Sequence, residues 1–335
     1  MIVPNHIIIS RTDSIGDVIL TLPVAAILKS YFPKVKITFL AQKYTEPVIR
    51  CSSDVDDVLC WDELKNKNDV VTLFKKLHAD TIIHVFPNKE IAALSKKAKI
   101  KYRIAIARRW YNLIYCNKLV NYSRKKSDLH EAQLNVKMLK PLGIEVLPTL
   151  DELVNCYHVK SKEILGYPEA FKWIDNHRFN LILHPCSKGS AREWGFENFN
   201  HLIELLPEEK FNIFISGTAD DKKKFSGKLN IQKANVHDIS GQLNLNEFIS
   251  FIDHCDGLLA ASTGPLHIAA MLGKHALGIY APMRPIHPGR WAPIGKKAKV
   301  FVLNKNCNDC RKSQNCACIK AIQANEVASY LTSIS

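Results

Sequence analysis

The sequence lacks the features that mark several common classes of protein. No apolar run reaches the roughly 18–20 residues that a membrane-spanning helix needs. No basic segment precedes an apolar one near the first residue, as it would in a signal peptide, so we expect a cytoplasmic protein. Zinc-finger spacing, an aromatic RNA-recognition motif and a basic zipper are also absent, and we therefore expect no nucleic-acid partner.

What the chain has in excess is positive charge. Its 335 residues carry a formal net charge of +14, and 47% of them are hydrophobic, which suffices for two domains with cores of their own. Much of the charge lies in clusters at residues 96–99, 108–109, 124–126 and 222–224. Such a field favours polyanionic partners, among them phosphate-bearing substrates and an anionic membrane surface. The alternative is that these residues serve only solubility.

Four of the ten cysteines lie within twelve residues, and the other six are scattered as reduced core thiols of a cytosolic protein would be. The four are Cys307, Cys310, Cys316 and Cys318, spaced C-x2-C-x5-C-x-C. This density is compatible with a structural zinc or iron site, although the spacing is not that of a standard zinc knuckle or ribbon. Reduced thiols or a disulfide pair are the alternatives.

Apolar runs and helical patterns alternate along the chain, which predicts an α/β protein with doubly wound parallel sheets. In the first half we expect strands at 6–10, 35–40, 80–86 and 100–106, and helices at 17–31, 43–50, 69–78, 88–97 and 130–141. In the second half we expect strands at 180–184, 211–216, 236–239, 256–261 and 275–280, helices at 197–206, 219–228, 246–254 and 265–272, and a last helix from 325 to 331.

A change of composition at 155–178 predicts a linker between two Rossmann-like domains, 1–160 and 161–335. The ligand site of such a pair is expected at the carboxyl ends of the strands, in the cleft between the domains.

The first candidate loop, residues 11–17, follows the first expected strand. Gly16 would let the backbone turn tightly or approach a ligand. Asp17 begins the helical pattern, so it serves either as a helix N-cap or as a base at the mouth of a cleft. The glycine spacing is not a dinucleotide-binding fingerprint, and a Walker lysine is missing.

The second candidate loop begins at Ser262, after the expected strand at 256–261. Small hydroxyl residues and Gly264 lead straight into a helix, whose unpaired N–H groups and dipole favour an anion. Pro265 suits the first helical turn, and His267 is near enough to reach the same spot. An ordinary strand–helix turn is the alternative.

Three further loops, 184–194, 217–221 and 240–245, also follow expected strands. Lys188 and Arg192 supply cations which, with the donors at the second candidate loop, suit a diphosphate. Asp220 or Asp221 would accept hydrogen bonds from ribose hydroxyls.

At residues 7–23 and 262–270 the chain resembles the bacterial ADP-heptose:lipopolysaccharide heptosyltransferases, glycosyltransferase family nine. Residues 184–194, with 196–199 behind them, resemble the phosphate loop of that family. The resemblance covers about residues 6–330. It implies a GT-B fold with an N-terminal acceptor domain, a C-terminal ADP-sugar domain and a last helix that returns to the first domain.

The resemblance also implies roles for single residues. The family's general base falls on Asp17, its phosphate-binding lysine on Arg192, and its Asp-Thr-Gly-x-x-His motif on 262–267. Arginine for lysine keeps the charge but changes the geometry. The aspartate often found in the motif is Ser262 here, which puts its contact with the donor sugar in doubt. Taken together, the candidate donor-binding residues are Ser187, Lys188, Arg192, Asp220, Leu243, Ser262, Thr263, Gly264 and His267, and the candidates on the acceptor side are Ser14 and Gly16.

The implied reaction is an inverting transfer in one displacement, with Asp17 taking the proton of the acceptor hydroxyl. Cations and N–H groups would stabilise the leaving ADP, and the family needs no metal for this step. The implied partners are an ADP-sugar donor and a phosphorylated glycolipid or glycan acceptor at the inner face of an anionic membrane. A nucleotide-sugar epimerase or hydrolase of the GT-B fold, or a non-catalytic sugar-nucleotide-binding protein, is the alternative.

Overall fold

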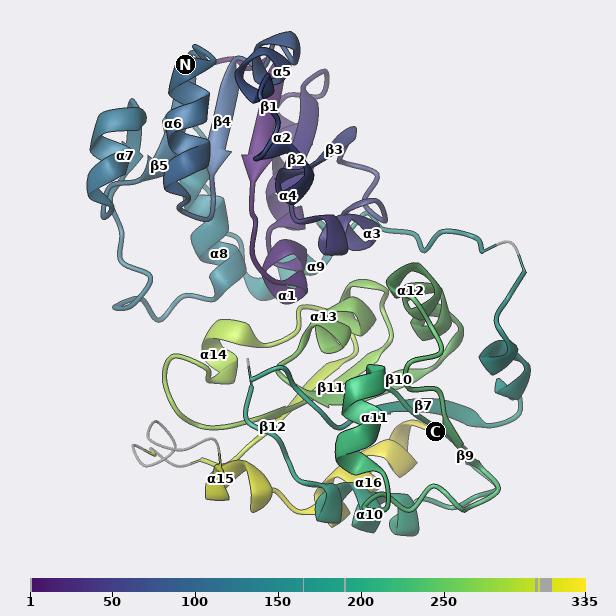
Figure 1. The fold of residues 1–335 in the computed structure, drawn as a ribbon. Helices are drawn as coiled ribbons and strands as arrows, with labels where there is room; N and C mark the ends of the chain where they lie inside the picture. Colours follow the sequence, from purple (N-terminus) through teal and green to yellow (C-terminus); the bar gives the residue numbers. More distant parts are fainter. Residues whose placement is uncertain (1, 165, 190, 305–306, 308–314) are drawn as a thin grey trace. The chain divides into compact units, whose positions relative to one another are not determined.

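The computed structural model describes residues 2–164, 166–189, 191–304, 307 and 315–335. The chain forms two compact units that divide between Lys160 and Ser161 (Figure 1). Each unit is built on one six-stranded sheet, and every strand pair in both sheets is parallel. The expected pair of doubly wound α/β units is therefore confirmed.

The sheet of the N-terminal unit has the order β3-β2-β1-β4-β5-β6. Its strands are β1 (His6–Ser10), β2 (Lys36–Ala41), β3 (Asp57–Cys60), β4 (Thr81–His84), β5 (Tyr102–Ile106) and β6 (Lys118–Val120). Its helices are α1 (Ile15–Ile19), α2 (Leu22–Tyr31), η1 (Lys43–Thr45), α3 (Glu46–Ile49), α4 (Trp61–Leu64), α5 (Val70–Lys76), α6 (Lys89–Lys97), α7 (Trp110–Tyr115), α8 (Glu131–Val136), η2 (Lys137–Leu142) and α9 (Leu150–Val154).

The sheet of the C-terminal unit has the order β12-β11-β10-β7-β8-β9. Its strands are β7 (Phe179–His184), β8 (Phe211–Ile215), β9 (Val236–Asp238), β10 (Gly257–Ala261), β11 (His275–Tyr280) and β12 (Ala298–Val302). Its helices are η3 (Glu169–Trp173), α10 (Phe196–Leu205), α11 (Ala219–Phe225), α12 (Leu245–His254), α13 (Gly264–Met271), α14 (Pro288–Trp291), α15 (Ala317–Lys320) and α16 (Ala324–Ile334).

The central strands are apolar throughout because helices cover both faces of a parallel sheet. All five residues of β1 are buried, and so are all five of β10. Since both faces are covered, the ligand-accessible parts of each unit are the loops at the carboxyl ends of these strands.

The helix expected at 17–31 is two helices in the structure. α1 ends at Ile19 and α2 begins at Leu22, with the Thr21 hydroxyl donating to the Asp17 carbonyl at 2.8 Å. Pro23 therefore lies in the first turn of α2, where its missing N–H is not needed.

The last helix, α16, belongs to the C-terminal unit and lies beside α10 (Figure 1). The implied return of this helix to the N-terminal domain stays a prediction. Its apolar face, with Val327 and Leu331 fully buried, belongs to the core under the C-terminal sheet. Burial of that face is what fixes the helix there.

Candidate functional site

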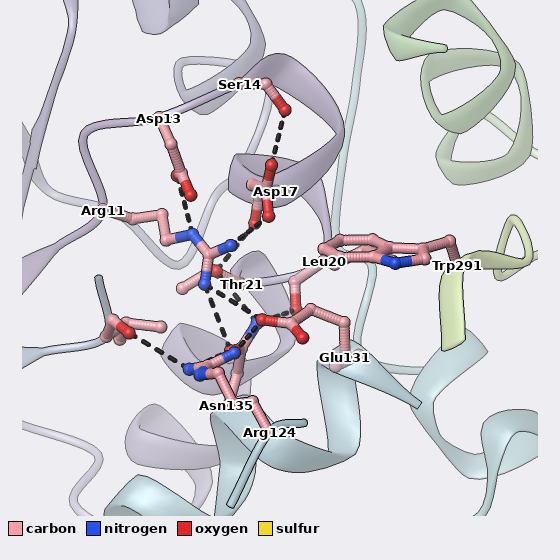
Figure 2. A network of polar contacts seen from close by, with 12 residues as sticks. Arg11, Asp13, Ser14, Asp17, Leu20, Thr21, Arg124, Glu131, Asn135 and Trp291 are labelled. Carbon is pink, nitrogen blue, oxygen red and sulfur yellow. Dashed lines mark hydrogen bonds and ion pairs between the residues drawn. The ribbon is translucent and has the colours of Figure 1, made fainter. Parts of the chain in front are cut away.

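The turn between β1 and α1 is built around a buried arginine. The Arg11 side chain is only 3% exposed, and its Nε donates to Asp13 Oδ1 at 2.7 Å. Its Nη2 forms an ion pair with Asp17, and its Nη1 donates to Glu131 Oε1 at 3.3 Å. Figure 2 shows this guanidinium between the three carboxylates. One cation therefore holds side chains from two segments far apart in the sequence.

The same network continues into α8. Glu131 also pairs with Arg124, whose Nη2 donates to the Val85 carbonyl at 3.1 Å and to Asn135 Oδ1 at 3.2 Å. The Asn135 amide donates in turn to the Leu20 carbonyl at 2.9 Å, between α1 and α2 (Figure 2). These bonds fix the turn after β1 from both sides, so the Asp17 carboxylate is held in one orientation.

Asp17 is the third residue of α1 and not its N-cap, which is Ser14. Of its two carboxylate oxygens, Oδ1 meets Arg11 and Oδ2 accepts a hydrogen bond from the exposed Ser14 hydroxyl at 2.5 Å. The Asp17 side chain is 17% exposed. It is thus oriented by a cation and is also partly open to solvent, as a general base needs to be.

Asp13 was not selected from the sequence, yet it is the second carboxylate on Arg11. Burial raises the pKa of Asp13 to about 6, against the opposing charge of Arg11 and with a contribution from the negative charge of Asp17. The Asp13 carboxyl therefore gains a proton on mild acidification. Carboxyl groups with a raised pKa are frequent at sites of proton transfer.

In the C-terminal unit, Ser262 and Arg192 line the same small pocket, together with Tyr280 and Ile286. Ser262 hydrogen-bonds to the Tyr280 hydroxyl, which donates to the Trp291 carbonyl at 2.5 Å. Burial raises the pKa of Tyr280, so its hydroxyl stays protonated. Arg192, from the loop after β7, and Ser262, from the loop after the neighbouring strand β10, are thus brought together as the sequence predicts.

The start of α13 supports the expected anion site. Thr263 is its N-cap, but the Thr263 side chain does not cap the helix. Its buried hydroxyl has no hydrogen-bond partner among the residues that the structure describes. Gly264 begins the helix and His267 lies one turn in, where it is buried. A buried hydroxyl beside the first turn of a helix is a donor set suited to phosphate.

The loop after β7 is held in shape by its own residues. The Ser187 N–H donates to Glu193 Oε1 at 2.6 Å, and the Ser187 hydroxyl donates to the Ala191 carbonyl at 3.0 Å. Trp194 is buried and donates to the Ile322 carbonyl at 2.9 Å. Lys188 is exposed. Arg192 therefore lies between two anchored residues, and Glu193 is an anchor that the sequence reasoning missed.

Asp220 and Leu243 follow β8 and β9, which lie on the other side of β7 from β10. Asp220 is exposed and pairs with Lys223 at 2.9 Å, while Leu243 is half-buried. Its neighbour Asp221 is buried and closes a capping box with Thr218 at the start of α11. The structure thus assigns Asp221 a structural role and leaves Asp220 accessible to a ligand.

The cysteine cluster is only partly described. Cys316 and Cys318 are buried in the C-terminal core, and Cys307 packs against that core. Cys310 lies outside the described residues. Within the described ranges, no three His, Cys, Asp or Glu side chains are grouped as metal ligands. The metal site stays a prediction.

The comparisons with known proteins decide the family. The family model for glycosyltransferase family 9 (heptosyltransferase) matches residues 70–319, more than half of the chain. The chain belongs to glycosyltransferase family 9. The transferase is thus a glycosyl-transferring enzyme, and the resemblance seen in its motifs is confirmed. Among its described residues, none of the helices is long and apolar enough to cross a membrane.

Two curated relatives come from Haemophilus influenzae. A putative glycosyltransferase is 28% identical over 306 residues, covering 87% of the transferase and 86% of the relative. The lipopolysaccharide core heptosyltransferase OpsX is 23% identical over 317 residues, covering 90% and 86%.

Two solved Escherichia coli structures show the same GT-B fold. ADP-heptose lipopolysaccharide heptosyltransferase II matches with a TM-score of 0.75 at 16% identity, covering 98% of each chain. Heptosyltransferase WaaC with ADP matches with a TM-score of 0.71 at 17% identity, covering 98% of this chain and 100% of the other. The GT-B fold predicted from the sequence is therefore confirmed.

Proposed function

We propose that this transferase moves a heptose, or a related sugar, from an ADP-sugar to a lipopolysaccharide core or another phosphorylated glycan. The observation that carries the proposal is the oriented, partly exposed carboxylate of Asp17 on Arg11, at the carboxyl end of β1. The relatives support the sugar and the acceptor, since they include lipopolysaccharide heptosyltransferases. Family membership favours transfer over epimerisation, hydrolysis or sensing without catalysis.

On the acceptor side, Asp17 takes the proton of the attacking hydroxyl as the new glycosidic bond forms at the anomeric carbon. The bond from that carbon to the β-phosphate of ADP breaks in the same step, so the configuration inverts and no covalent enzyme intermediate forms. Ser14 and Arg11 hold the two carboxylate oxygens in the free state. The acceptor hydroxyl would replace Ser14, which is the exposed partner.

On the donor side, the leaving diphosphate gains negative charge as the bond breaks. Arg192 supplies a cation at the pocket that it shares with Ser262, and Lys188 is an exposed cation on the same loop. Thr263 and the first N–H groups of α13 supply neutral donors. Donors that are already in position stabilise this charge at little cost in reorganisation. Ser262 hydrogen-bonds to Tyr280, so its use as a sugar contact requires a change of partner.

We propose no metal for the transfer step. A zinc or iron ion held by the four clustered cysteines would be structural, because four thiolates leave no open position for a substrate. One Escherichia coli glycosyltransferase of similar fold, TibC, is described as iron-containing, which is a statement about that protein. Elemental analysis of protein purified without chelators tests the site here. One equivalent of zinc or iron, lost in Cys310→Ser, supports it; substoichiometric metal with four readily alkylated thiols contradicts it.

The function is tested with ADP-heptose and a soluble core acceptor, followed by mass spectrometry of the product and an assay for ADP. Acceptor-dependent ADP release with a heptose-sized mass gain is the expected result. ADP release without acceptor would indicate a hydrolase, and conversion of the sugar alone would indicate an epimerase.

Asp17→Asn is the decisive variant. We expect it to keep ADP binding and to lower turnover by roughly 10²–10⁴-fold, the usual effect of losing an acid–base group. Asp57→Asn, which changes an exposed carboxylate on the edge strand β3, outside the candidate loops, is the control for the substitution itself. Turnover like the wild type in Asp17→Asn would reduce Asp17 to a partner of Arg11.

A further inference from the structure

The short helix α7 presents apolar side chains to solvent. Trp110 and Leu113 are each 62% exposed and Ile114 is 51% exposed. Their spacing of three and four residues places them on one face of the helix. The opposite face is apolar too, since Tyr111 and Tyr115 pack against a small core. A surface helix normally turns polar residues outward, so this outer face needs an explanation.

The apolar face of α7 is held in place by hydrogen bonds. Asn112 is buried and donates to the Ile106 carbonyl at 2.9 Å. At the other end, Arg103 donates to the Tyr115 carbonyl at 2.7 Å, and Lys96 of α6 donates to the Ile114 carbonyl at 3.0 Å. Two basic side chains thus satisfy the last carbonyls of the helix. The three apolar side chains stay exposed while the backbone beneath them is anchored.

The segment around α7 also has a large excess of positive over negative charge. Residues 85–127 contain 12 lysines and arginines and a single acidic residue, Glu90, which gives 12 − 1 = +11 of the formal +14. Lys89 lies 5.1 Å from the centre of the Trp110 ring. Arg108 and Arg109, both exposed, immediately precede the helix. The apolar face is therefore surrounded by cations in the sequence and bordered by them in space.

We propose that the α7 surface, made of Trp110, Leu113 and Ile114 with the basic residues beside them, docks on an anionic lipid bilayer. The apolar side chains would enter the interfacial region, where tryptophan is favoured, and the cations would contact lipid phosphates. A nucleic acid would use the charges and the ring but not Leu113 and Ile114. The inference extends the proposed function, because an acceptor that is a glycolipid would be reached from that surface.

Binding is measured by sedimentation with vesicles of phosphatidylcholine alone or with phosphatidylglycerol added. We expect binding to the anionic vesicles only, weakening as salt is raised, because the attraction to the lipid charge is screened. Trp110→Ser/Leu113→Ser/Ile114→Ser should weaken it at least tenfold, and Arg108→Gln/Arg109→Gln should weaken it and reduce its dependence on salt.

Two matched controls accompany these variants. Leu147→Ser/Leu150→Ser changes exposed apolar residues elsewhere in the same unit, and Lys222→Gln/Lys223→Gln removes two exposed cations from α11. Both should bind vesicles as the wild type does. Brominated lipids should quench the fluorescence of the vesicle-bound wild type more strongly than that of the vesicle-bound Trp110→Phe protein. This difference would place Trp110 in the bilayer without a disruptive variant.

Transfer to a soluble acceptor separates this inference from the proposed function. It should be unchanged in all α7 variants, since none alters the candidate site. Equal vesicle binding by the triple variant and the wild type would overturn the docking surface, as would retention on RNA without binding to vesicles. If neither the wild type nor any α7 variant transferred sugar to the soluble acceptor, while the wild type still bound anionic vesicles, only the proposed function would be overturned.

Discussion

Arg11 connects carboxylates that the sequence keeps more than a hundred residues apart. Its guanidinium meets Asp13 and Asp17 near the N-terminus and Glu131 on α8. Because Arg11 is buried, removal of any one carboxylate shifts charge and orientation at the others. The candidate base is therefore one member of a network, and its neighbours contribute to its placement.

The pKa of Asp13 leads to a prediction about stability. Burial raises this pKa to about 6 from the ordinary 3.8, so between these values the folded protein holds a proton that the unfolded chain has lost. The contribution of Asp13 to the free energy of unfolding therefore falls by on the order of 1–3 kcal/mol as pH rises from about 4 to about 6. Above about pH 6 this contribution is constant.

Denaturant unfolding of wild type and Asp13→Asn across that pH range measures the effect. The wild type should lose stability relative to the variant as pH rises, whereas Asp220→Asn should run parallel to the wild type. If the free energies of unfolding of the wild type and Asp13→Asn changed with pH in parallel, the pKa of Asp13 would be the same in the folded and the unfolded protein.

The donor residues give a second prediction at this scale. Arg192→Ala should weaken ADP binding roughly 10–100-fold, because a charge-assisted hydrogen bond is lost. High salt should reduce the difference in ADP affinity between the wild type and the variant. Thr263→Val, which keeps the shape of the side chain and removes its hydroxyl, should weaken ADP binding by a smaller factor. Calorimetric titration decides, with Lys222→Ala as a control for lost charge. Unchanged affinity in both variants would exclude the C-terminal unit's pocket as the ADP site.

At the scale of elements, two of the five candidate loops end in a helix whose first turn is closed by a capping box. Asn244 accepts a hydrogen bond from the Glu247 N–H at 3.1 Å, and its own N–H donates to the Glu247 carboxylate at 2.7 Å. This capping box fixes the end of the β9–α12 loop, which contains Leu243. A second capping box, made by Thr218 and Asp221, lies at the start of α11. The N-cap of α13 is the contrast, since the Thr263 hydroxyl is not used for capping.

Asn244→Ala should lower the free energy of unfolding by about 0.5–2 kcal/mol, because α12 loses its side-chain cap. Asn246→Ala, two residues on and exposed in the same helix, should change it by no more than about 0.5 kcal/mol. Chemical denaturation measures both. An equal effect of the two substitutions would mean that the capping box does not stabilise α12.

Element prediction from the sequence succeeded where strands are central. β1, β7 and β10 read as apolar runs because they are buried on both faces. β3, β6 and β12 were missed, since they are edge or near-edge strands of three to five residues with exposed polar positions, such as Asp57 and Lys118. Their pairing comes from the neighbouring strand and not from their own composition.

At the scale of the whole molecule, each unit has its own sheet and core, and the segment between them has little structure of its own. Its described residues from 161 to 168 belong to no helix or strand, and Lys160 and Lys162 are both exposed. Local openings there break few hydrogen bonds, in contrast to the sheets on either side.

Limited digestion with trypsin should therefore cut first after Lys160 or Lys162, leaving two resistant fragments that can be identified by mass. Lys160→Ser/Lys162→Ser should delay that first cut without changing the unfolding temperature. A first cut inside either sheet would contradict the division into two stable units.

The sequence by itself determined the class of the fold and the order of the main elements, and it supplied the candidate loops. It could do so because buried parallel strands and helix-start signals are local patterns, and because the family motifs fall on short contiguous segments. Asp17, Arg192 and the 262–267 turn became candidates in this way, and their roles stay predictions.

Only the tertiary structure decided which side chains act on one another. The ion pairs of Arg11 with Glu131, the pocket shared by Arg192 and Ser262, and the seat of α16 against α10 all join residues distant in the chain. Likewise, the sequence of α7 does not say which of its apolar side chains are covered. Tyr111 and Leu113 are both apolar positions of one short helix, but in the structure Tyr111 packs against the core and Leu113 is exposed. A local pattern fixes that a face is apolar, but what covers that face is a property of the folded chain.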